Sequence, residues 1–274
     1  MLRENGDHVT RRKLGAEEIC VYDAGQGAAV VLIHGMFGDF LDWEPVLAPL
    51  SRSRRVIALD LPGFGSSSKP RREYTADFVL STLSELLHDL SIDQATLVGN
   101  SFGGQIAILY ALAHPEAVAK MVLVNSGGFQ RFTPDEIAFT ESRFNEAALA
   151  ALTPEINALL FSPVFVHSSA TSAAYLQRQN AKLTRADFPA YAYAIASNIR
   201  LSLATYLIDR LPEIACSTLL IWGEQDIVLP LSLAKLALPR LRQGEIAVIP
   251  GCGHAPQLEC PQQFMASLTP FLEK

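Results

Sequence analysis

The sequence predicts an α/β fold in which helices cover both faces of a mostly parallel sheet. Short apolar runs rich in β-branched residues alternate with segments whose apolar residues recur every three or four positions. The chain has 274 residues, 49% hydrophobic and 18% charged, so it can bury a large core in one domain. Because strands that alternate with helices form right-handed βαβ units, neighbouring strands are expected to be parallel.

Seven apolar runs bounded by glycine, proline or aspartate are predicted to be strands. They are residues 19–22, 30–33, 56–59, 96–98, 121–124, 218–222 and 246–249. Between them, Val79 and Leu83 belong to a helical pattern for which Thr75 is the expected N-cap. Phe102 and Ile106 begin a similar pattern directly after Ser101.

The alternation stops between about Gly127 and Pro212. No strand pattern is evident there, and Ala, Leu and Phe recur at helical spacing between prolines. We therefore expect a helical insertion, or cap, at 127–212 and a core formed by residues 1–126 and 213–274.

Charge and hydropathy argue against several partners. The chain has 22 basic and 28 acidic residues, a net charge of -6, and no basic block that would neutralise a nucleic-acid backbone. Its longest apolar stretch, 28–33, is far shorter than the roughly 20 residues that cross a bilayer. The charged segment 1–13 lacks the apolar region of a secretory signal. We expect a cytoplasmic monomer or homodimer without a transmembrane segment or a nucleic-acid partner.

The four cysteines are too few and too scattered to predict a disulfide framework. Cys252, His254 and Cys260 are of ligand type, but structural zinc usually requires paired ligands such as C-x-x-C, and the sequence has no second pair. Free thiols, no metal and no cofactor are therefore expected.

Residues 99–103 read Gly-Asn-Ser-Phe-Gly, a G-x-S-x-G pattern between a predicted strand and a predicted helix. A serine at such a sharp turn is exposed at the carboxyl edge of the sheet, and Gly99 and Gly103 allow close packing around it. The helix N-terminus also offers unpaired N–H groups where an oxyanion would develop. This context predicts that Ser101 is a nucleophile.

A serine hydroxyl needs a base and an acid that orients the base. His254 lies in a flexible loop directly after the last predicted strand, from which it can reach the sheet edge. Asp226 follows the preceding strand and completes the order Ser, Asp, His, with Glu224 as its nearest rival. Another position sometimes used for the acid carries Asn125, which cannot hold the negative charge.

Other polar residues are given structural or binding roles. His34 and Asp60 are interpreted as residues that brace their loops, while His167 in the insertion is a candidate for substrate contact. The oxyanion would be held by the backbone N–H groups of Met36 and Phe102. The residues expected to contact substrate are Gly35, Phe37, Asn100, Phe129, Phe165 and Val228.

Five motifs, in order along nearly the whole chain, resemble those of the α/β-hydrolase superfamily. They are His34-Gly35, Asp-Leu-Pro-Gly-Phe-Gly at 60–65, Gly-Asn-Ser-Phe-Gly-Gly at 99–104, residues 223–226 and Gly253-His254. The resemblance implies a mostly parallel eight-stranded sheet flanked by helices, with a helical cap inserted after the sixth strand. The insertion at 127–212 fits such a cap.

Two groups within the superfamily are most similar. Carboxylesterases and monoacylglycerol-lipase-like enzymes share the His-Gly loop and a segment similar to 253–259. Hydrolases of carbon–carbon bonds in meta-cleavage products of aromatic degradation often share the turn at 99–104. Those enzymes usually have a Ser-Gly-Pro-Gly loop and an aromatic residue after the histidine, where this chain has residues 36–39 and Ala255. Haloalkane dehalogenases and epoxide hydrolases require an aspartate in place of Ser101.

The sequence and the resemblance together predict a serine hydrolase of carboxylic esters with small to medium acyl or aromatic groups. The aromatic residues of the insertion are expected either to line the substrate pocket or to pack the insertion onto the core. The main alternative is a carbon–carbon bond hydrolase. A receptor-like protein with little turnover and a cofactor-free lyase or perhydrolase also remain, because fold does not fix function.

Overall fold

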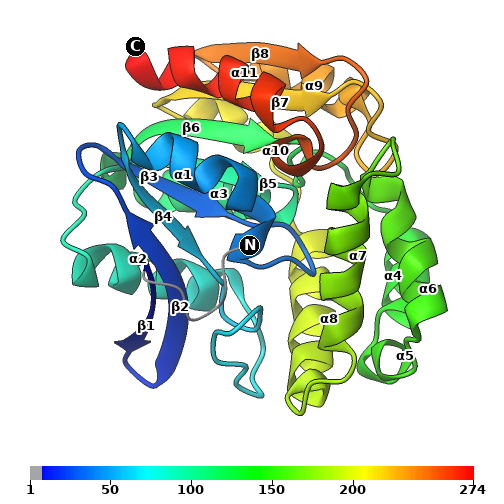
Figure 1. Cartoon of the computed structure of the whole chain (residues 1–274). Helices are drawn as coiled ribbons and strands as arrows, with labels where there is room; N and C mark the ends of the chain where they lie inside the picture. Colours follow the sequence, from blue (N-terminus) through cyan, green and yellow to red (C-terminus); the bar gives the residue numbers. More distant parts are fainter. Residues whose placement is uncertain (1–7) are drawn as a thin grey trace.

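A computed structural model describes residues 8–274, in which eight strands form one sheet (Figure 1). Their order across the sheet is β1-β2-β4-β3-β5-β6-β7-β8. β2 is antiparallel to β1 and β4, and the remaining neighbours are parallel. The strands are β1 (Val9–Leu14), β2 (Glu17–Ala24), β3 (Ala29–Ile33), β4 (Arg55–Leu59), β5 (Ala95–Asn100), β6 (Val118–Val124), β7 (Ser217–Gly223) and β8 (Gly244–Ile249). The predicted class, an α/β fold with a mostly parallel eight-stranded sheet, is confirmed.

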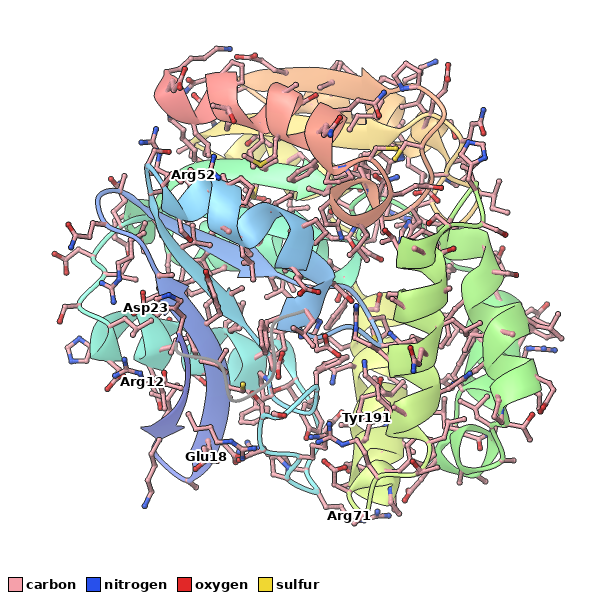
Figure 2. All side chains as sticks on the ribbon, in the orientation of Figure 1. Arg12, Glu18, Asp23, Arg52, Arg71 and Tyr191 are labelled. Carbon is pink, nitrogen blue, oxygen red and sulfur yellow. The ribbon has the colours of Figure 1, made fainter. Side chains whose placement is uncertain are left out.

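The strand β1 was not among the seven predicted from apolar runs. It pairs with β2 at the edge of the sheet and carries three consecutive basic residues, so it has no apolar run to detect. Charged side chains are common on edge strands because they discourage pairing with another chain. Arg11 in β1 forms an ion pair of 2.9 Å with Glu18 in β2, and Figure 2 shows Glu18 and Arg12 on this hairpin.

Helices connect the strands and cover both faces of the sheet. They are α1 (Glu44–Ser51), α2 (Ala76–Asp89), α3 (Phe102–Ala113), α4 (Pro134–Arg143), α5 (Glu146–Ala150), α6 (Pro154–Phe161), α7 (Ala170–Lys182), α8 (Phe188–Ala204), α9 (Leu231–Ala237), α10 (Pro256–Glu259) and α11 (Pro261–Glu273). Successive residues of β3 point to opposite faces. Val31 and Ile33 join one hydrophobic cluster with α2 and α3, whereas Val30 and Leu32 join another with α1 and α11.

The two predicted helical patterns are confirmed as α2 and α3. α2 begins directly after Thr75, whose side chain accepts a hydrogen bond of 3.3 Å from the backbone N–H of Phe78. This bond satisfies one of the N–H groups that the first turn leaves unpaired, which is why threonine marks the start of the helix.

The interval between β6 and β7, described in full, contains helices and no strand. Its five α-helices, α4 to α8, contact one another and lie on the side of the sheet toward which the parallel strands point (Figure 1). We propose that residues 127–212 form a cap on the core and that both boundaries lie close to those positions.

Within residues 8–274, no helix combines the length and apolar character needed to cross a bilayer. The prediction about a secretory signal rests on residues 1–13, of which 1–7 lie outside the described residues. All four cysteines are free thiols, as expected.

Candidate active site

Ser101 occupies a strained turn between β5 and α3. Its φ of 53° and ψ of -117° form a combination that residues with a side chain rarely adopt. The turn is closed tightly: a Cβ atom at Gly99 would meet the backbone of Gly103, and one at Gly103 would meet the carbonyl oxygen of Ile33. The two glycines therefore allow the helix and strands to approach closely enough to hold Ser101 in this conformation.

His254 and Asp226 lie together although 28 residues separate them. His254 follows β8, and its Nδ1 lies 2.8 Å from Oδ2 of Asp226, which follows β7. Because an ionised carboxylate only accepts hydrogen bonds, Nδ1 carries the proton and Nε2 is left as the accepting ring nitrogen. Both side chains are largely buried, whereas Glu224, the rival acid, is exposed.

The Asp226 carboxylate is held by several donors. Its Oδ1 accepts hydrogen bonds from the backbone N–H groups of Val228 and Leu229, at 2.8 and 3.0 Å. Its Oδ2 accepts one from the side-chain amide of Asn125 at 2.5 Å, in addition to the contact with His254. These bonds fix the orientation of the carboxylate toward the imidazole.

Asn125 has a role in the site that the sequence does not predict. The sequence indicates only that this residue cannot hold the negative charge of the acid. In the structure it also accepts a hydrogen bond of 3.1 Å from the N–H of Gly223, so it ties the end of β6 to the end of β7 beside Asp226. Its place at the end of β6 is the one sequence signal for this role, because β6 and β7 are neighbouring strands.

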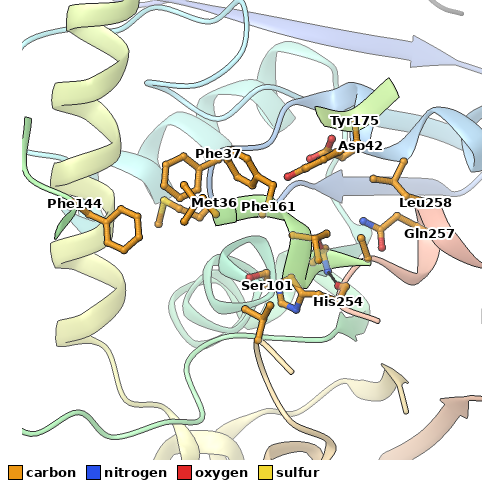
Figure 3. A pocket seen from close by; sticks show the side chains of 16 residues that line it. Met36, Phe37, Asp42, Ser101, Phe144, Phe161, Tyr175, His254, Gln257 and Leu258 are labelled. Atoms are coloured by element: carbon orange, nitrogen blue, oxygen red, sulfur yellow. Dashed lines mark hydrogen bonds between the residues drawn. The ribbon is translucent and has the colours of Figure 1, made fainter. Parts of the chain in front are cut away.

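A cavity of about 230 Å³ lies where the carboxyl edge of the sheet meets the helical interval, and Ser101 and His254 both line it (Figure 3). Its wall is mostly apolar. The residues from α6, α7 and the segments beside them include Phe144, Leu160, Phe161, Val164 and Tyr175. Such a wall suits an acyl chain or an aromatic ring.

Four of the predicted substrate contacts line this cavity, namely Gly35, Phe37, Asn100 and Val228. The amide nitrogen of Asn100 is already used, since it donates hydrogen bonds of 3.1 Å to the carbonyl oxygens of Val124 and His254. Asn100 therefore also holds the backbone of the loop that carries the imidazole.

The other two predicted contacts lie elsewhere. Phe165 lines a neighbouring cavity formed within the helical interval, as does His167. Phe129 is 1% exposed and stacks on Trp222 with ring centres 6.2 Å apart, inside the hydrophobic core. The expected substrate contact of Phe129 is therefore corrected: the chain after β6 turns this ring toward the sheet, where burial stabilises it.

The two predicted oxyanion donors belong to segments that adjoin Ser101. Phe102 is the first residue of α3, where the N–H has no partner within the helix. Met36 lies on the loop after β3 and lines the cavity. Gly35 brings this loop close to the nucleophile, because a Cβ atom there would lie only 3.3 Å from Cβ of Ser101.

His34 and Asp60 brace their loops, as expected. Nδ1 of His34 lies 2.8 Å from the carbonyl oxygen of Gly35, and Nε2 accepts a hydrogen bond of 3.0 Å from the N–H of Leu61. Burial lowers the pKa of His34 to about 4, so the ring is neutral near pH 7. Asp60 accepts hydrogen bonds from the backbone N–H groups of Phe40 and of Ser66, the latter in its own loop.

Side chains from α7 and α8 bind the loop that carries Met36. The carbonyl oxygen of Phe37, a residue with a φ of 63°, accepts hydrogen bonds from Nζ of Lys182 at 2.6 Å and from the hydroxyl of Tyr191 at 3.2 Å. Lys182 also forms an ion pair of 3.0 Å with Asp39. The helical interval therefore contacts the loop one residue away from a predicted oxyanion donor.

A second ion pair continues this buried cluster, since Nη2 of Arg178 lies 2.5 Å from Oδ1 of Asp42. Burial alone would raise the pKa of Asp39, but the charges of Lys182 and Arg178 outweigh it and lower that pKa to about 2. Burial and the charge of Asp39 raise the pKa of Asp42 to about 6. The cluster thus holds two carboxylates in different electrostatic environments.

In the structure, Cys252 and Cys260 lie near Glu259 and do not form a group of possible metal ligands with His254. In the described part of the chain, Cys252, Glu259 and Cys260 bring ligand-type atoms within 4.8 Å of one another, and His254 is not among them. The Glu259 carboxylate accepts hydrogen bonds from three backbone N–H groups. Burial raises the pKa of both thiols, which disfavours the thiolate form that binds metals.

A family model described as the alpha/beta hydrolase fold matches residues 28–261. The chain belongs to this family. This α/β hydrolase is 30% identical in sequence to a 2-hydroxymuconate semialdehyde hydrolase of Pseudomonas sp. (strain CF600). The alignment covers 92% of this chain and 89% of the relative.

Two solved structures are similar to this chain in both sequence and fold. A membrane phospholipase A, described as a bacterial virulence factor, is 28% identical with a TM-score of 0.81, over 97% of this chain and 86% of that one. A meta-cleavage product hydrolase from Pseudomonas fluorescens IP01 is 25% identical with a TM-score of 0.83, over 98% of both chains. The proteins similar to this α/β hydrolase therefore include a phospholipase as well as a meta-cleavage product hydrolase.

Proposed function

We propose that this α/β hydrolase cleaves carboxylic esters of small to medium acyl or aromatic groups, with Ser101 as the nucleophile. The main support is the 2.8 Å contact between His254 and Asp226 at the wall of the cavity into which Ser101 opens. A serine activated by an oriented imidazole is the usual arrangement for acyl transfer.

The first half of the reaction forms an acyl-enzyme. Nε2 of His254 takes the proton of the Ser101 hydroxyl as its oxygen attacks the ester carbonyl carbon. The resulting oxyanion accepts hydrogen bonds from the N–H groups of Met36 and Phe102. When the ester C–O bond breaks, the imidazolium returns the proton to the leaving alkoxide, and the alcohol departs.

The second half releases the acid. His254 takes a proton from a water molecule, whose oxygen attacks the acyl carbon, and the same two N–H groups hold the second oxyanion. Collapse of this intermediate breaks the bond to Ser101, which recovers its proton from His254. Asp226 stays ionised throughout and stabilises the imidazolium in both halves.

Hydrolysis of carbon–carbon bonds is the second candidate function. It is favoured by the relatives named as a 2-hydroxymuconate semialdehyde hydrolase and a meta-cleavage product hydrolase. Against it, Ala255 stands after the histidine and lines a mostly apolar cavity, whereas the similar carbon–carbon hydrolases usually carry an aromatic residue there. We therefore rank it second.

A substrate panel separates the two candidates. We expect the wild type to hydrolyse p-nitrophenyl esters best at one acyl length between acetate and palmitate, and to turn over a vinylogous 1,5-diketone slowly. Ser101→Ala should lose at least about 10³-fold in kcat. Asp226→Asn should lose about 10⁴-fold, because the imidazole loses its orienting partner, whereas Glu224→Gln should match the wild type. Efficient diketone turnover with poor ester turnover would favour the second candidate, and an active Ser101→Ala would refute both.

A further inference from the structure

Gln257 is a fully buried amide at the wall of the cavity. It lies in α10, three residues after His254, and its side chain is labelled in Figure 3. Neither its Oε1 nor its Nε2 has a hydrogen-bond partner among residues 8–274. A buried amide without partners destabilises a fold, so such a group in a ligand cavity points to a ligand atom that satisfies it.

Two further polar side chains share this part of the cavity. Asp42 and Tyr175 both line it, and both are at most 6% exposed. α10 packs against α7, which carries Tyr175, and against the short turn Phe40–Trp43, which carries Asp42. Figure 3 shows Asp42, Tyr175 and Gln257 on one side of the cavity, with Phe144 on the opposite side.

The charges around these side chains favour a neutral ligand group. Asp42 is paired with Arg178, and Asp39 is paired with Lys182, so two carboxylates face two cations. An anionic ligand group would be repelled by the Asp42 carboxylate, and the ion pair with Arg178 already balances the charge that would attract a cationic one. A neutral group avoids the repulsion and needs no counter-charge.

The hydrogen-bonding capacity of the three side chains further restricts which chemical group of a ligand could bind there. Asp42 in its ionised form only accepts, the Gln257 amide both donates and accepts, and so does the Tyr175 hydroxyl. A hydroxyl group can donate one hydrogen bond to the carboxylate and accept others from the amide or the phenol. Hydrocarbon alone would leave both polar atoms of the Gln257 amide unsatisfied.

We propose that Asp42, Tyr175 and Gln257 form a polar subsite that binds a neutral hydroxyl group of the substrate. This inference rests on the proposed ester hydrolysis at Ser101 and specifies its substrate as a hydroxylated ester. The hydroxyl belongs either to the acyl chain or to the alcohol part, because both present the same chemistry to the subsite.

Matched pairs of esters test the subsite and identify the source of the hydroxyl. The acyl arm compares p-nitrophenyl hexanoate with its 3-hydroxy and 6-hydroxy derivatives. The alcohol arm compares butyl butyrate with 4-hydroxybutyl butyrate. In one arm the wild type should favour the hydroxylated ester by about tenfold or more in kcat/KM, since a site built for a hydroxyl discriminates against substrates that lack it. A ratio near one in both arms would overturn the subsite while leaving ester hydrolysis intact.

Three variants assign the preference to these residues. Gln257→Met removes both polar atoms at nearly constant length, and Tyr175→Phe removes one hydroxyl. Each should bring the ratio between the paired substrates close to one. Gln179→Met is the matched control, because Gln179 is another buried glutamine with an unpartnered Nε2 but lines a different cavity. Its ratio should equal that of the wild type. A preference that survives in both Gln257→Met and Tyr175→Phe would refute the assignment.

A binding measurement separates this inference from the proposed reaction. Calorimetry with Ser101→Ala should give tighter binding of butane-1,4-diol or 6-hydroxyhexanoate than of butan-1-ol or hexanoate, and Gln257→Met introduced into that variant should abolish the difference. Loss of turnover in Ser101→Ala with the binding difference present supports both proposals. Equal binding of the paired ligands would contradict the subsite alone, and full turnover by Ser101→Ala would contradict the reaction alone.

Discussion

At the scale of single residues, the strained conformation of Ser101 is the clearest link between local structure and chemistry. Residues with side chains rarely combine a φ of 53° with a ψ of -117°, and holding one there costs about 1–3 kcal/mol. The surrounding fold supplies that free energy through the tight packing that Gly99 and Gly103 allow. The hydroxyl is thereby presented to the cavity rather than turned into the helix.

Replacing Ser101 with glycine should therefore stabilise the fold while removing the nucleophile. Glycine adopts positive φ without steric cost, so we expect the free energy of unfolding to rise by about 1–2 kcal/mol. Ser101→Ala is the control, since it removes the hydroxyl but keeps the strained Cβ. Urea unfolding of the three proteins measures the difference. Equal stabilities of Ser101→Gly and Ser101→Ala would show that the turn stores no strain at this residue.

The buried His34 should make the fold sensitive to acid. Its pKa is lowered by burial from about 6.5 to about 4, so the unfolded chain binds a proton that the folded chain excludes. The free energy of unfolding should fall by up to about 3 kcal/mol as pH drops from 6.5 to 4. Over part of this range the raised pKa of Asp42, about 6, acts in the opposite direction, because the folded state favours its protonated form.

Comparison with His34→Asn isolates the histidine contribution. Asparagine retains a donor for the Gly35 carbonyl but does not titrate. We expect the stability of this variant, measured by urea unfolding between pH 4 and 7, to decline less than that of the wild type on acidification. Parallel curves for the two proteins would mean that His34 is not the group responsible.

At the scale of elements, the helical interval supports the loop after β3. Lys182 from α7 contacts both the carbonyl oxygen of Phe37 and the carboxylate of Asp39. The loop conformation, including the positive φ of Phe37, is thus held by a residue more than 140 positions away. We infer that closure of this contact helps to aim the N–H of Met36 at the oxyanion.

Lys182→Met should damage both stability and catalysis. Asp39 would be left as a buried charge without its ammonium partner, at a cost of about 3–5 kcal/mol. The loop would shift, and a displacement of about 1 Å near the reacting groups lowers kcat by up to about a hundredfold. Urea unfolding and ester kinetics measure the two effects.

Two controls define the role of Lys182. Lys235→Met, on the exposed side of α9, should match the wild type in both measurements. Adding Asp39→Asn to Lys182→Met should recover part of the stability without restoring kcat. A Lys182→Met protein with normal kcat would show that the loop is positioned without this contact.

The elements that could be predicted are those with a local signal. The apolar strands and the helices α2 and α3, which precede and follow β5, are predictable because period and capping residues specify them within a few positions. β1 was missed because its charged edge sequence resembles a solvated segment. Asn125, and Gln257 in its proposed role, are not predictable as site residues because their surroundings come from distant chain segments, as in the contact between Asn125 and Asp226, 101 positions apart.

At the scale of the whole molecule, the site is assembled by topology. Parallel strands bring the segments after β3, β5, β7 and β8 to one edge of the sheet, so Met36, Ser101, Asp226 and His254 converge there. This convergence follows from the fold class and was predictable. The cavity shape was not, because it depends on how the α4–α8 interval packs against that edge, and the position of Phe129 in the core shows the limit of assigning pocket residues from sequence.

Mass spectrometry of the trapped acyl-enzyme shows directly which residue forms the covalent intermediate. The protein is mixed with a p-nitrophenyl ester, quenched in acid within the burst phase, digested and mapped. We expect an added acyl mass on the peptide that contains Ser101, its absence in Ser101→Ala, and its accumulation in His254→Ala only at a greatly reduced rate. An acyl adduct on another residue, or rapid ester turnover by Ser101→Ala, would show that Ser101 is not the nucleophile.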